Sequence, residues 1–431
     1  MAEVSAFRGL RYDEEKAGKL ADLVTPPYDI ISAQEQQAFY QRNPANVIRL
    51  EYAMEQEGDH PGENKYTRAK KSLEEFLEKG WLKEEEQPSI YVYEQVFSVP
   101  NGETKSFKGI IARVRLEEFE KQVVIPHEET LSKAKTDRLN LMDQTNCNFS
   151  QVYCLYQDEK REIYPAIEAQ SQGEPSFSFT TEDGILQRVW ILQDPQVLAQ
   201  ITASFQEEQL YIADGHHRYE TALNFRNKLR DENPNHTGEE GYNHMMMFLV
   251  NMDNPGLLVF PTHRLIRDLP EFQEEKLLEK LSLDFSIEKM KGIDAIEPSL
   301  DLAGKKVFGL YTGGDFFYRL VLKNQQLMDQ LIPEKSAAYK NLDVSILHSG
   351  ILERFLGIDK ENMANQKNLI YTRSLQEAIE GVQSGGFQCA FILNATQIRE
   401  IKEVTLGKEK MPQKSTYFWP KLVTGIVINQ F

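Results

Sequence analysis

One stretch constrains the fold of this chain more than any other, residues 209–223, which read QLYIADGHHRYETAL. The apolar run at 210–213 predicts a buried strand, and the Asp-Gly pair at 214–215 ends it. A helical pattern follows from Tyr219, and its apolar face comprises Ala222, Leu223 and Phe225. The chain therefore turns directly from a strand into a helix, with polar side chains at the helix N-terminus.

These polar residues suit a phosphorylated ligand. The N-terminus of a helix carries partial positive charge and N–H groups, so the backbone at Gly215 favours an anion. Arg218 can hold a phosphate through two parallel hydrogen bonds, and His216 and His217 can contact the same group. Asp214 can hold a metal ion or take a proton. The stretch predicts a phosphate and metal site.

A purely structural explanation stands beside this one. Asp214 could serve only as a helix cap, and the two histidines could be packed and hydrogen-bonded without further function. A zinc site built on both histidines is not expected, because adjacent histidines lack the usual ligand spacing and no cysteine lies nearby. We favour function, because four polar side chains share one helix start.

A second polar cluster, IPHEET at 125–130, follows a predicted strand. Glu128 or Glu129 can deprotonate a hydroxyl or hold Mg²⁺ beside His127. The predicted helix that follows adds further charged side chains, namely Lys133, Lys135, Asp137 and Arg138, and its Lys and Arg residues could meet a phosphate. Alternatively, the two glutamates merely occupy the first helical turn, where acidic residues are favoured. Both clusters lie at strand-to-helix junctions of one predicted unit, so we expect them to converge.

A third stretch, MPQKSTYFWPK at 411–421, is too polar for a core strand and too aromatic for an ordinary loop. Lys414, Ser415 and Thr416 could contact phosphate, or the stretch could be a turn whose aromatic rings cover a domain interface. Neither a P-loop nor a GxGxxG motif is present, so any nucleotide site is of a different kind. The chain also lacks the nucleophile elbow of a serine hydrolase.

Composition limits the class of protein. The net charge of -17 argues against a general nucleic-acid binder, which needs clustered Lys and Arg to displace counterions. The N-terminus has no apolar signal segment, and the longest apolar run, 245–250, is far below a membrane span. Three scattered cysteines predict reduced thiols and a cytoplasmic protein.

A chain of 431 residues is expected to form two or three domains. We predict an α/β (α+β) protein of three units, at 1–106, 107–270 and 271–431. Expected elements include a capping box from Ser32 to Glu35, a turn and strand over 43–52, and a helix at 65–80. The third unit is expected to hold a hairpin across 312–315, a helix at 342–357 and a βαβ unit at 368–394.

Over nearly its whole length the sequence resembles a bacterial family of unknown function, "ten-fifteen". The matching stretches are TPPYDIIS, PHEET with DRL, ADGHHRYETA, LDVSILH and MPQKSTYFWPK. Its members are often described as relatives of the chromosome-partitioning protein ParB. The DGHHR element is also similar to that of free-serine kinases in the ParB/sulfiredoxin superfamily, which phosphorylate L-serine with ADP or ATP. The resemblance implies a ParB/sulfiredoxin-like core at 107–270.

The resemblance also implies roles for individual residues. Glu128 or Glu129 would be the base, and Asp214, His216, His217 and Arg218 would contact phosphate and metal. We therefore expect a cytoplasmic kinase that uses ATP or ADP with Mg²⁺ and transfers a phosphoryl group to a hydroxylated metabolite, with L-serine the first candidate. The alternatives are a ParB-like nucleotide-binding protein that associates with DNA or a protein, and a metal-dependent hydrolase. We expect no membrane or nucleic-acid partner, and leave open whether the chain forms a homodimer.

Overall fold

The computed structural model describes residues 1–99, 102–128 and 132–431. The chain is a mixture of helices and sheets, which confirms the predicted α+β class. It forms two compact units, each made of separate chain segments. Unit 1 comprises Met1–Pro126, Thr130–Leu258 and Pro420–Phe431, and unit 2 comprises His127–Glu129 and Val259–Trp419. The prediction of three units differs from this arrangement because strands on both sides of residue 106 belong to one sheet.

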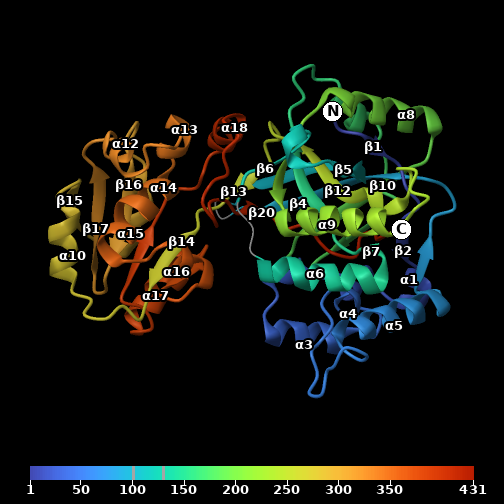
Figure 1. The fold of residues 1–431 in the computed structure, drawn as a ribbon, viewed down its shortest axis with the longest axis horizontal. Helices are drawn as coiled ribbons and strands as arrows, with labels where there is room; N and C mark the ends of the chain where they lie inside the picture. The colour runs from blue at the N-terminus through green and yellow to red at the C-terminus, as the bar shows by residue number, and fades with distance from the viewer. Residues whose placement is uncertain (100–101, 129–131) are drawn as a thin grey trace. The chain divides into compact units, whose positions relative to one another are not determined.

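Unit 1 is built on a nine-stranded sheet (Figure 1). Most neighbouring strands are antiparallel, whereas β11 pairs in parallel with β6, and β12 with β8. The main path of the sheet runs β6 (Val124–Pro126), β11 (Leu210–Asp214), β8 (Val152–Tyr156), β12 (His244–Asn251), β5 (Thr104–Arg115), β4 (Ile90–Ser98), β10 (Leu186–Leu192) and β9 (Phe177–Thr180), and β1 (Val4–Ser5) pairs with β5. The β4–β5 hairpin crosses the predicted boundary at 106.

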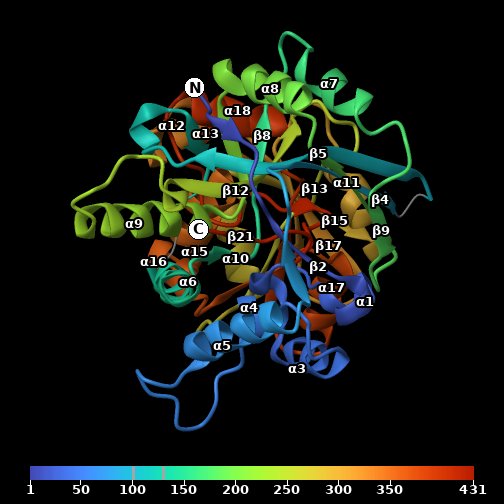
Figure 2. The ribbon, with the colours of Figure 1, turned by 90° about the vertical axis from the view of Figure 1, so that its right-hand side faces the viewer.

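Helices of unit 1 pack beside this sheet. α9 (His216–Glu232) packs on α6 (Ser132–Thr145), and α6 packs on α5 (Lys65–Glu78) (Figure 1, Figure 2). The predicted capping box of Ser32 and Glu35 opens α3 (Ala33–Arg42). The other helical segments include α1 (Glu14–Ala17), α2 (Leu20–Leu23), η1 (Tyr28–Ile30), α4 (Ile48–Glu51), α7 (Ile163–Ala169) and α8 (Pro195–Ser204).

Residues 43–52 form no strand, contrary to prediction. The Asn46 side chain accepts the N–H of Ile48 at 2.9 Å, and the chain then coils into α4. A local side-chain acceptor thus starts a helical turn where the apolar pattern indicated extended chain.

The last residues of the chain, 420–431, belong to unit 1. Thr25 and Thr424 exchange two backbone hydrogen bonds of 3.2 and 2.8 Å, and Leu10 and Ile428 bridge in the same way. β21 (Asn429–Gln430) pairs with β7 (Cys147–Asn148). Residues 422–428 are all buried, so this segment is part of the core of unit 1.

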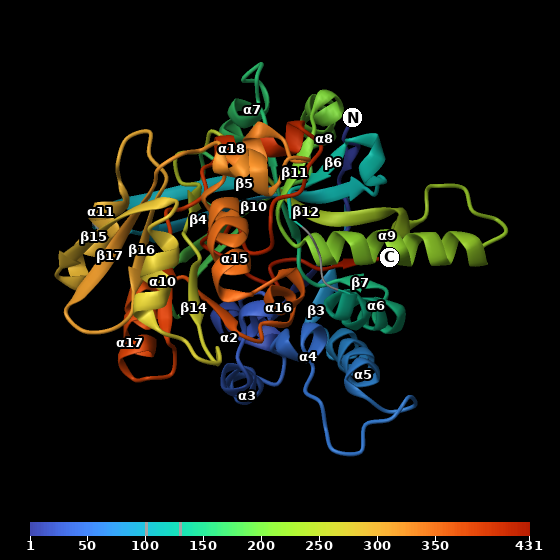
Figure 3. The same cartoon turned by 60° about the vertical axis from the view of Figure 1, so that its left-hand side comes forward.

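Unit 2 contains a six-stranded sheet in which all neighbouring strands pair antiparallel (Figure 3). Its order is β15 (Phe285–Lys291), β17 (Phe316–Leu322), β16 (Val307–Tyr311), β19 (Cys389–Ile392), β14 (His263–Ile266) and β18 (Leu369–Thr372). The predicted hairpin across 312–315 joins β16 and β17. The predicted strand–helix–strand at 368–394 is present as β18, α17 (Leu375–Gln383) and β19, with β14 lying between the two strands.

Neighbouring residues along these strands contribute to different apolar clusters, as expected of a sheet covered on both faces. Ile266 packs with residues of α10 (Glu274–Leu281) and α14 (Asp343–Leu347), whereas Leu265 packs with residues of α11 (Ile296–Leu300) and α17. The predicted helix at 342–357 continues from α14 through a π-helical turn, η6 (His348–Leu352), into α15 (Glu353–Leu356). The remaining helices of this unit include α12 (Leu327–Leu331), α13 (Ala337–Lys340), α16 (Lys360–Asn365) and α18 (Ile398–Leu406).

No helix within the described part of the chain has both the length and the apolar character needed to cross a bilayer.

Candidate functional site

The strand-to-helix turn predicted from the sequence is present in unit 1. β11 ends at Asp214, and α9 begins at His216 rather than at the predicted Tyr219. His216, His217 and Arg218 therefore lie in the first turn of the helix. The N-cap residue is Gly215, which has a φ of 94°. A Cβ at this position would lie 2.9 Å from Nε of Arg218, so both the backbone conformation and the guanidinium require glycine here.

Asp214 is paired with two cations. Its Oδ2 accepts a hydrogen bond of 2.6 Å from Nη2 of Arg218, and its Oδ1 pairs with the ammonium of Lys421. Burial alone would raise the pKa of Asp214, but Lys421, Arg218 and His216 lower it well below its usual range. Asp214 is therefore an anion held between two cations, and it does not cap the helix.

Arg218 is buried, and both of its terminal nitrogens donate within the protein. Nη1 donates to the backbone carbonyl of Gln151 at 2.6 Å, and Nη2 donates to Asp214. This differs from the predicted two-pronged contact with a phosphate, because the guanidinium already holds two acceptors. Arg218 fixes Asp214 in place, and His216 is buried while His217 is half-buried in the same turn.

Lys421 completes this arrangement, which we call the α9 site: Asp214, Gly215, His216, His217, Arg218 and Lys421. The backbone carbonyl of Lys421 accepts a hydrogen bond of 3.2 Å from Nε2 of Gln95. Its side chain is only 11% exposed. The stretch at 411–421 was singled out in the sequence, but its candidate phosphate contacts were Lys414, Ser415 and Thr416. Lys421 and Asp214 are 207 positions apart in the sequence, so no local pattern indicates that they pair.

A second group of charges lies beside Arg218 in unit 1. Arg138, on α6, is buried; its Nη1 donates to the carbonyl of Glu51 at 3.0 Å, and its guanidinium lies 3.9 Å from the ring centre of Tyr28. Burial would lower the pKa of Arg138, but Tyr28, Asp137 and Glu51 raise it. The charges of Glu51 and Asp29 also act on Arg218. The chain thus brings TPPYD, the 43–51 segment, DRL and DGHHR together, although only Arg138 among these neighbours was predicted as a contact.

His127 and Glu128 of the PHEET stretch form a separate cluster in unit 2. Nε2 of His127 and Oγ1 of Thr416 are 2.8 Å apart, and Oε1 of Glu128 accepts the N–H of Lys414 at 2.7 Å. Met411 donates its N–H to the carbonyl of His127 at 2.7 Å. The second and third sequence clusters therefore meet, and Ser415 lies buried between their contacts with its hydroxyl bonded to the carbonyl of Pro412.

Other predicted contacts have different positions. Glu129 lies outside the described residues, as does the side chain of Lys133. Lys135 pairs with Glu220 across α6 and α9 at 2.8 Å. The expectation that both clusters belong to one unit at 107–270 is corrected, because 127–129 joins unit 2 and Asp214 belongs to unit 1.

The residues of the α9 site do not fit a resident metal ion. Both carboxylate oxygens of Asp214 are engaged by cations. Across residues 1–99, 102–128 and 132–431, no three His, Cys, Asp or Glu side chains are grouped as metal ligands. The expected Mg²⁺ ligand role of Asp214 would require the loss of its pairing with Lys421.

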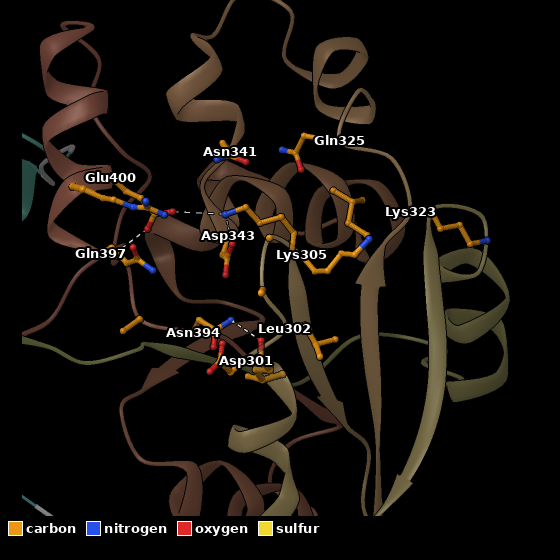
Figure 4. A pocket seen from close by; sticks show the side chains of 17 residues that line it. Asp301, Leu302, Lys305, Lys323, Gln325, Asn341, Asp343, Asn394, Gln397 and Glu400 are labelled. Carbon is orange, nitrogen blue, oxygen red and sulfur yellow. Dashed lines mark hydrogen bonds and ion pairs between the residues drawn. The ribbon is translucent and has the colours of Figure 1, made fainter.

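A cavity of about 790 Å³ lies within unit 2 (Figure 4). Lys306 pairs there with Asp343 at 2.8 Å and with Glu400 at 3.6 Å. Polar groups line most of the remaining wall, including Asp301, Lys305, Gln325, Asn341, Asn394, Gln397 and Arg399. None of the predicted site residues that the structure describes lines this cavity, whose wall comes from four segments of the chain within 300–306, 322–325, 341–343 and 394–400.

A family model described as "Protein of unknown function (DUF1015)" matches residues 4–345. The chain belongs to the DUF1015 family. The matched range contains TPPYD, PHEET and DGHHR, whereas Lys414 and Lys421 lie beyond it. No curated protein matches this DUF1015 chain in sequence.

Three solved structures are similar to this DUF1015 member. A free serine kinase in complex with AMP has a TM-score of 0.36 and 14% identity, over 73% of this chain and 92% of that one. A conserved hypothetical protein from Pyrococcus furiosus has a TM-score of 0.34 and 14% identity, over 72% and 90%. SbnI with C-terminal truncation from Staphylococcus aureus has a TM-score of 0.36 and 9% identity, over 73% and 85%.

Proposed function

We propose that the protein is a nucleotide-dependent phosphotransferase that acts on a small hydroxylated metabolite, with free L-serine as the first candidate acceptor. The α9 site carries the proposal. Arg218 and Lys421 place two positive charges around one ionised carboxylate, Asp214, at the start of a 17-residue helix. The excess positive charge and the helix N-terminus both favour a polyphosphate. A ParB/sulfiredoxin-like core and a cytoplasmic location remain parts of this proposal.

In the proposed reaction, a carboxylate base takes the proton of the acceptor hydroxyl, and Glu128 and Glu129 are the candidates that the family resemblance supplies for it. The acceptor oxygen then bonds to the terminal phosphorus of ATP or ADP as the bond from that phosphorus to the nucleotide breaks, so the nucleotide leaves with one phosphate fewer. Such transfers depend mainly on positioning and charge neutralisation. Lys421, His216, His217 and the backbone at Gly215 would stabilise the phosphoryl group, and Arg218 would position Asp214. Arg138, His127, Lys414, Ser415 and Thr416 stay candidate nucleotide contacts.

The nucleotide would bring its own Mg²⁺, since the α9 site offers no open pair of carboxylate oxygens. The ion usually retains several waters and binds chiefly through phosphates. No role in the transfer is assigned to a metal held by the protein.

The test combines nucleotide binding with product detection. The full chain is incubated with ATP or ADP, Mg²⁺ and a panel of hydroxylated metabolites that includes L-serine, and phosphorus NMR detects new phosphomonoesters. We expect Lys421→Met to lower kcat by about 10²-fold, the usual loss when one stabilising donor is removed. The matched control is Lys228→Met, because Lys228 lies on α9 but pairs with Asp143 at 2.8 Å. Arg218→Ala should also abolish transfer, but it strands two acceptors inside the protein.

Glu128→Gln separates the base from nucleotide binding. We expect a fall in kcat of about 10²-fold or more with unchanged nucleotide affinity, because the amide keeps its shape but accepts no proton. If nucleotide binds and no acceptor is phosphorylated, the ParB-like regulatory alternative replaces the kinase. If no nucleotide binds, the proposal fails altogether.

A further inference from the structure

The backbone that carries Lys421 into the α9 site is held by two buried glutamines. Residues 421–423 belong to neither a helix nor a strand, so regular structure supplies no partners for their carbonyls. Nε2 of Gln95 donates to the carbonyl of Lys421 at 3.2 Å, and Nε2 of Gln151 donates to the carbonyl of Val423 at 3.2 Å. Both glutamines are 1% exposed, and both belong to unit 1.

Gln95 is itself held by a buried polar network between β4 and β10. It lies directly opposite Gln187 on β10, and its Nε2 donates to Oε1 of Gln187 at 3.0 Å. The same oxygen accepts the hydroxyl of Tyr93 at 2.6 Å, and Nε2 of Gln187 donates to Oγ1 of Thr181 at 3.3 Å. Gln95 therefore uses both of its amide N–H groups, one toward Gln187 and one toward Lys421. Its amide can point only one way, because the reverse orientation would place its oxygen against two other oxygens.

Gln151 connects the two cations that hold Asp214. Its side chain holds the carbonyl of Val423, and its own backbone carbonyl accepts Nη1 of Arg218 at 2.6 Å. Arg218 and Lys421 pair with different oxygens of Asp214. One residue thus supports both positive charges of the α9 site through hydrogen bonds.

The two amides do not serve stability. Oε1 of Gln95 and Oε1 of Gln151 are buried without a hydrogen-bond partner among the residues described. A buried acceptor that gives up water and gains no partner destabilises the folded chain. The surroundings are otherwise apolar, since the Tyr93 ring packs against that of Phe248 with 5.5 Å between their centres. What the amides contribute is the position of the backbone at 421–423.

We propose that Gln95 and Gln151 are positioning residues of the α9 site. They fix the backbone at 421–423, so that the Lys421 ammonium stays against Asp214 and toward the phosphoryl group during transfer. Neither glutamine touches the nucleotide or the acceptor in this role. The effect on catalysis rests on the proposed phosphotransferase function, in which a displacement of about 1 Å is costly. The effect on Lys421 itself does not rest on it.

The first measurement is the rate of reductive methylation of Lys421, read by mass spectrometry on the full chain without nucleotide. In the wild type its ion pair and its burial protect this amine. Gln95→Met and Gln151→Met keep the length of the side chain and remove the amide. We expect Lys421 to react about tenfold faster in each variant, as for the loss of one hydrogen bond. The matched control is Gln388→Met, because Nε2 of Gln388 donates to the carbonyl of Leu269 at 2.9 Å in unit 2.

The second measurement uses the acceptor that the phosphorus NMR panel identifies. We expect Gln95→Met and Gln151→Met to lower kcat about tenfold with an unchanged KM for the acceptor. Gln388→Met loses two hydrogen bonds to Leu269, so it should be destabilised in urea to a similar extent and yet keep the wild-type kcat. A merely structural role of the two glutamines would give all three variants the same kcat.

Equal labelling of Lys421 in the wild type and in both glutamine variants would overturn the inference, as would a wild-type kcat in both of them. If the wild type phosphorylates no acceptor, the proposed function fails. The labelling result then decides by itself whether the two glutamines position Lys421.

Discussion

Asp137 shows how strongly single charges are coupled in unit 1. Lys65 lies 2.8 Å from one carboxylate oxygen, and Arg138 pairs with the other. Burial would raise the pKa of Asp137, but Arg138 and Lys65 lower it to about 2. A carboxyl whose pKa is lowered by folding stabilises the protein above its unfolded pKa of about 4, and this stabilisation disappears as the pH falls toward the folded pKa.

Asp137→Asn should therefore reduce the free energy of unfolding by about 2 kcal/mol at pH 7. The difference from the wild type should shrink between about pH 4 and about pH 2, where Asp137 itself becomes protonated. Urea unfolding at pH 7, 5 and 3 measures it. Asp143→Asn is the control, because its pair with Lys228 is more exposed and should contribute under about 0.5 kcal/mol. A difference that stays constant with pH would show that the carboxylate charge is not the cause.

Individual residues also mark the reach of sequence reasoning. Asp214, the histidines and Arg218 were found because they share one short stretch. Lys421 and Glu51 were not found, because the residues they interact with, Asp214 and Arg218, lie far from them in the sequence. No periodicity in a sequence records such a long-range pairing. The sequence likewise indicates that Arg218 is important but not where its side chain lies, because the guanidinium is oriented by a hydrogen bond to the carbonyl of Gln151.

Elements were predicted best where the pattern is long and locally capped. The helix at 65–80 and the capping box at Ser32 agree with α5 and α3 within two residues. The start of α9 was placed three residues late, because His216 and His217 carry no apolar signal although they are helical. That error matters, because a helix that begins at His216 places the Arg218 guanidinium against Gly215.

The start of α9 gives a prediction for the whole element. Gly215→Ala should destabilise the protein by about 1–2 kcal/mol, because alanine is strained at a φ of 94° and its Cβ would displace the Arg218 guanidinium. Gly184→Ala provides the control: its φ is 81°, but nothing lies within 4 Å of the new Cβ. Chemical denaturation of both variants separates the cost of backbone strain from the cost of displacing the Arg218 guanidinium. Equal losses in both variants would mean that the contact with Arg218 adds nothing beyond backbone strain.

At the scale of the whole molecule, the number of units was the feature least accessible to the sequence. The sequence analysis predicts boundaries at 106 and 270, but hydrogen bonding between β4 and β5 removes the first. The C-terminal segment returns to unit 1 through pairings with residues 10, 25, 147 and 148. Contacts between distant segments define these units, and linear composition carries no record of them.

Separate apolar cores predict separate responses to core mutations. Ile428 is fully buried in a core of unit 1, and Leu310 in a core of unit 2. Truncating either side chain to alanine should cost about 2–4 kcal/mol. Because each core belongs to one unit, we expect calorimetry to resolve two thermal transitions, with Ile428→Ala lowering one by about 5–10 °C and Leu310→Ala lowering the other. Leu406→Ala, at a position 60% exposed, should move neither. A single transition lowered equally by both core variants would instead mean that the two units unfold together.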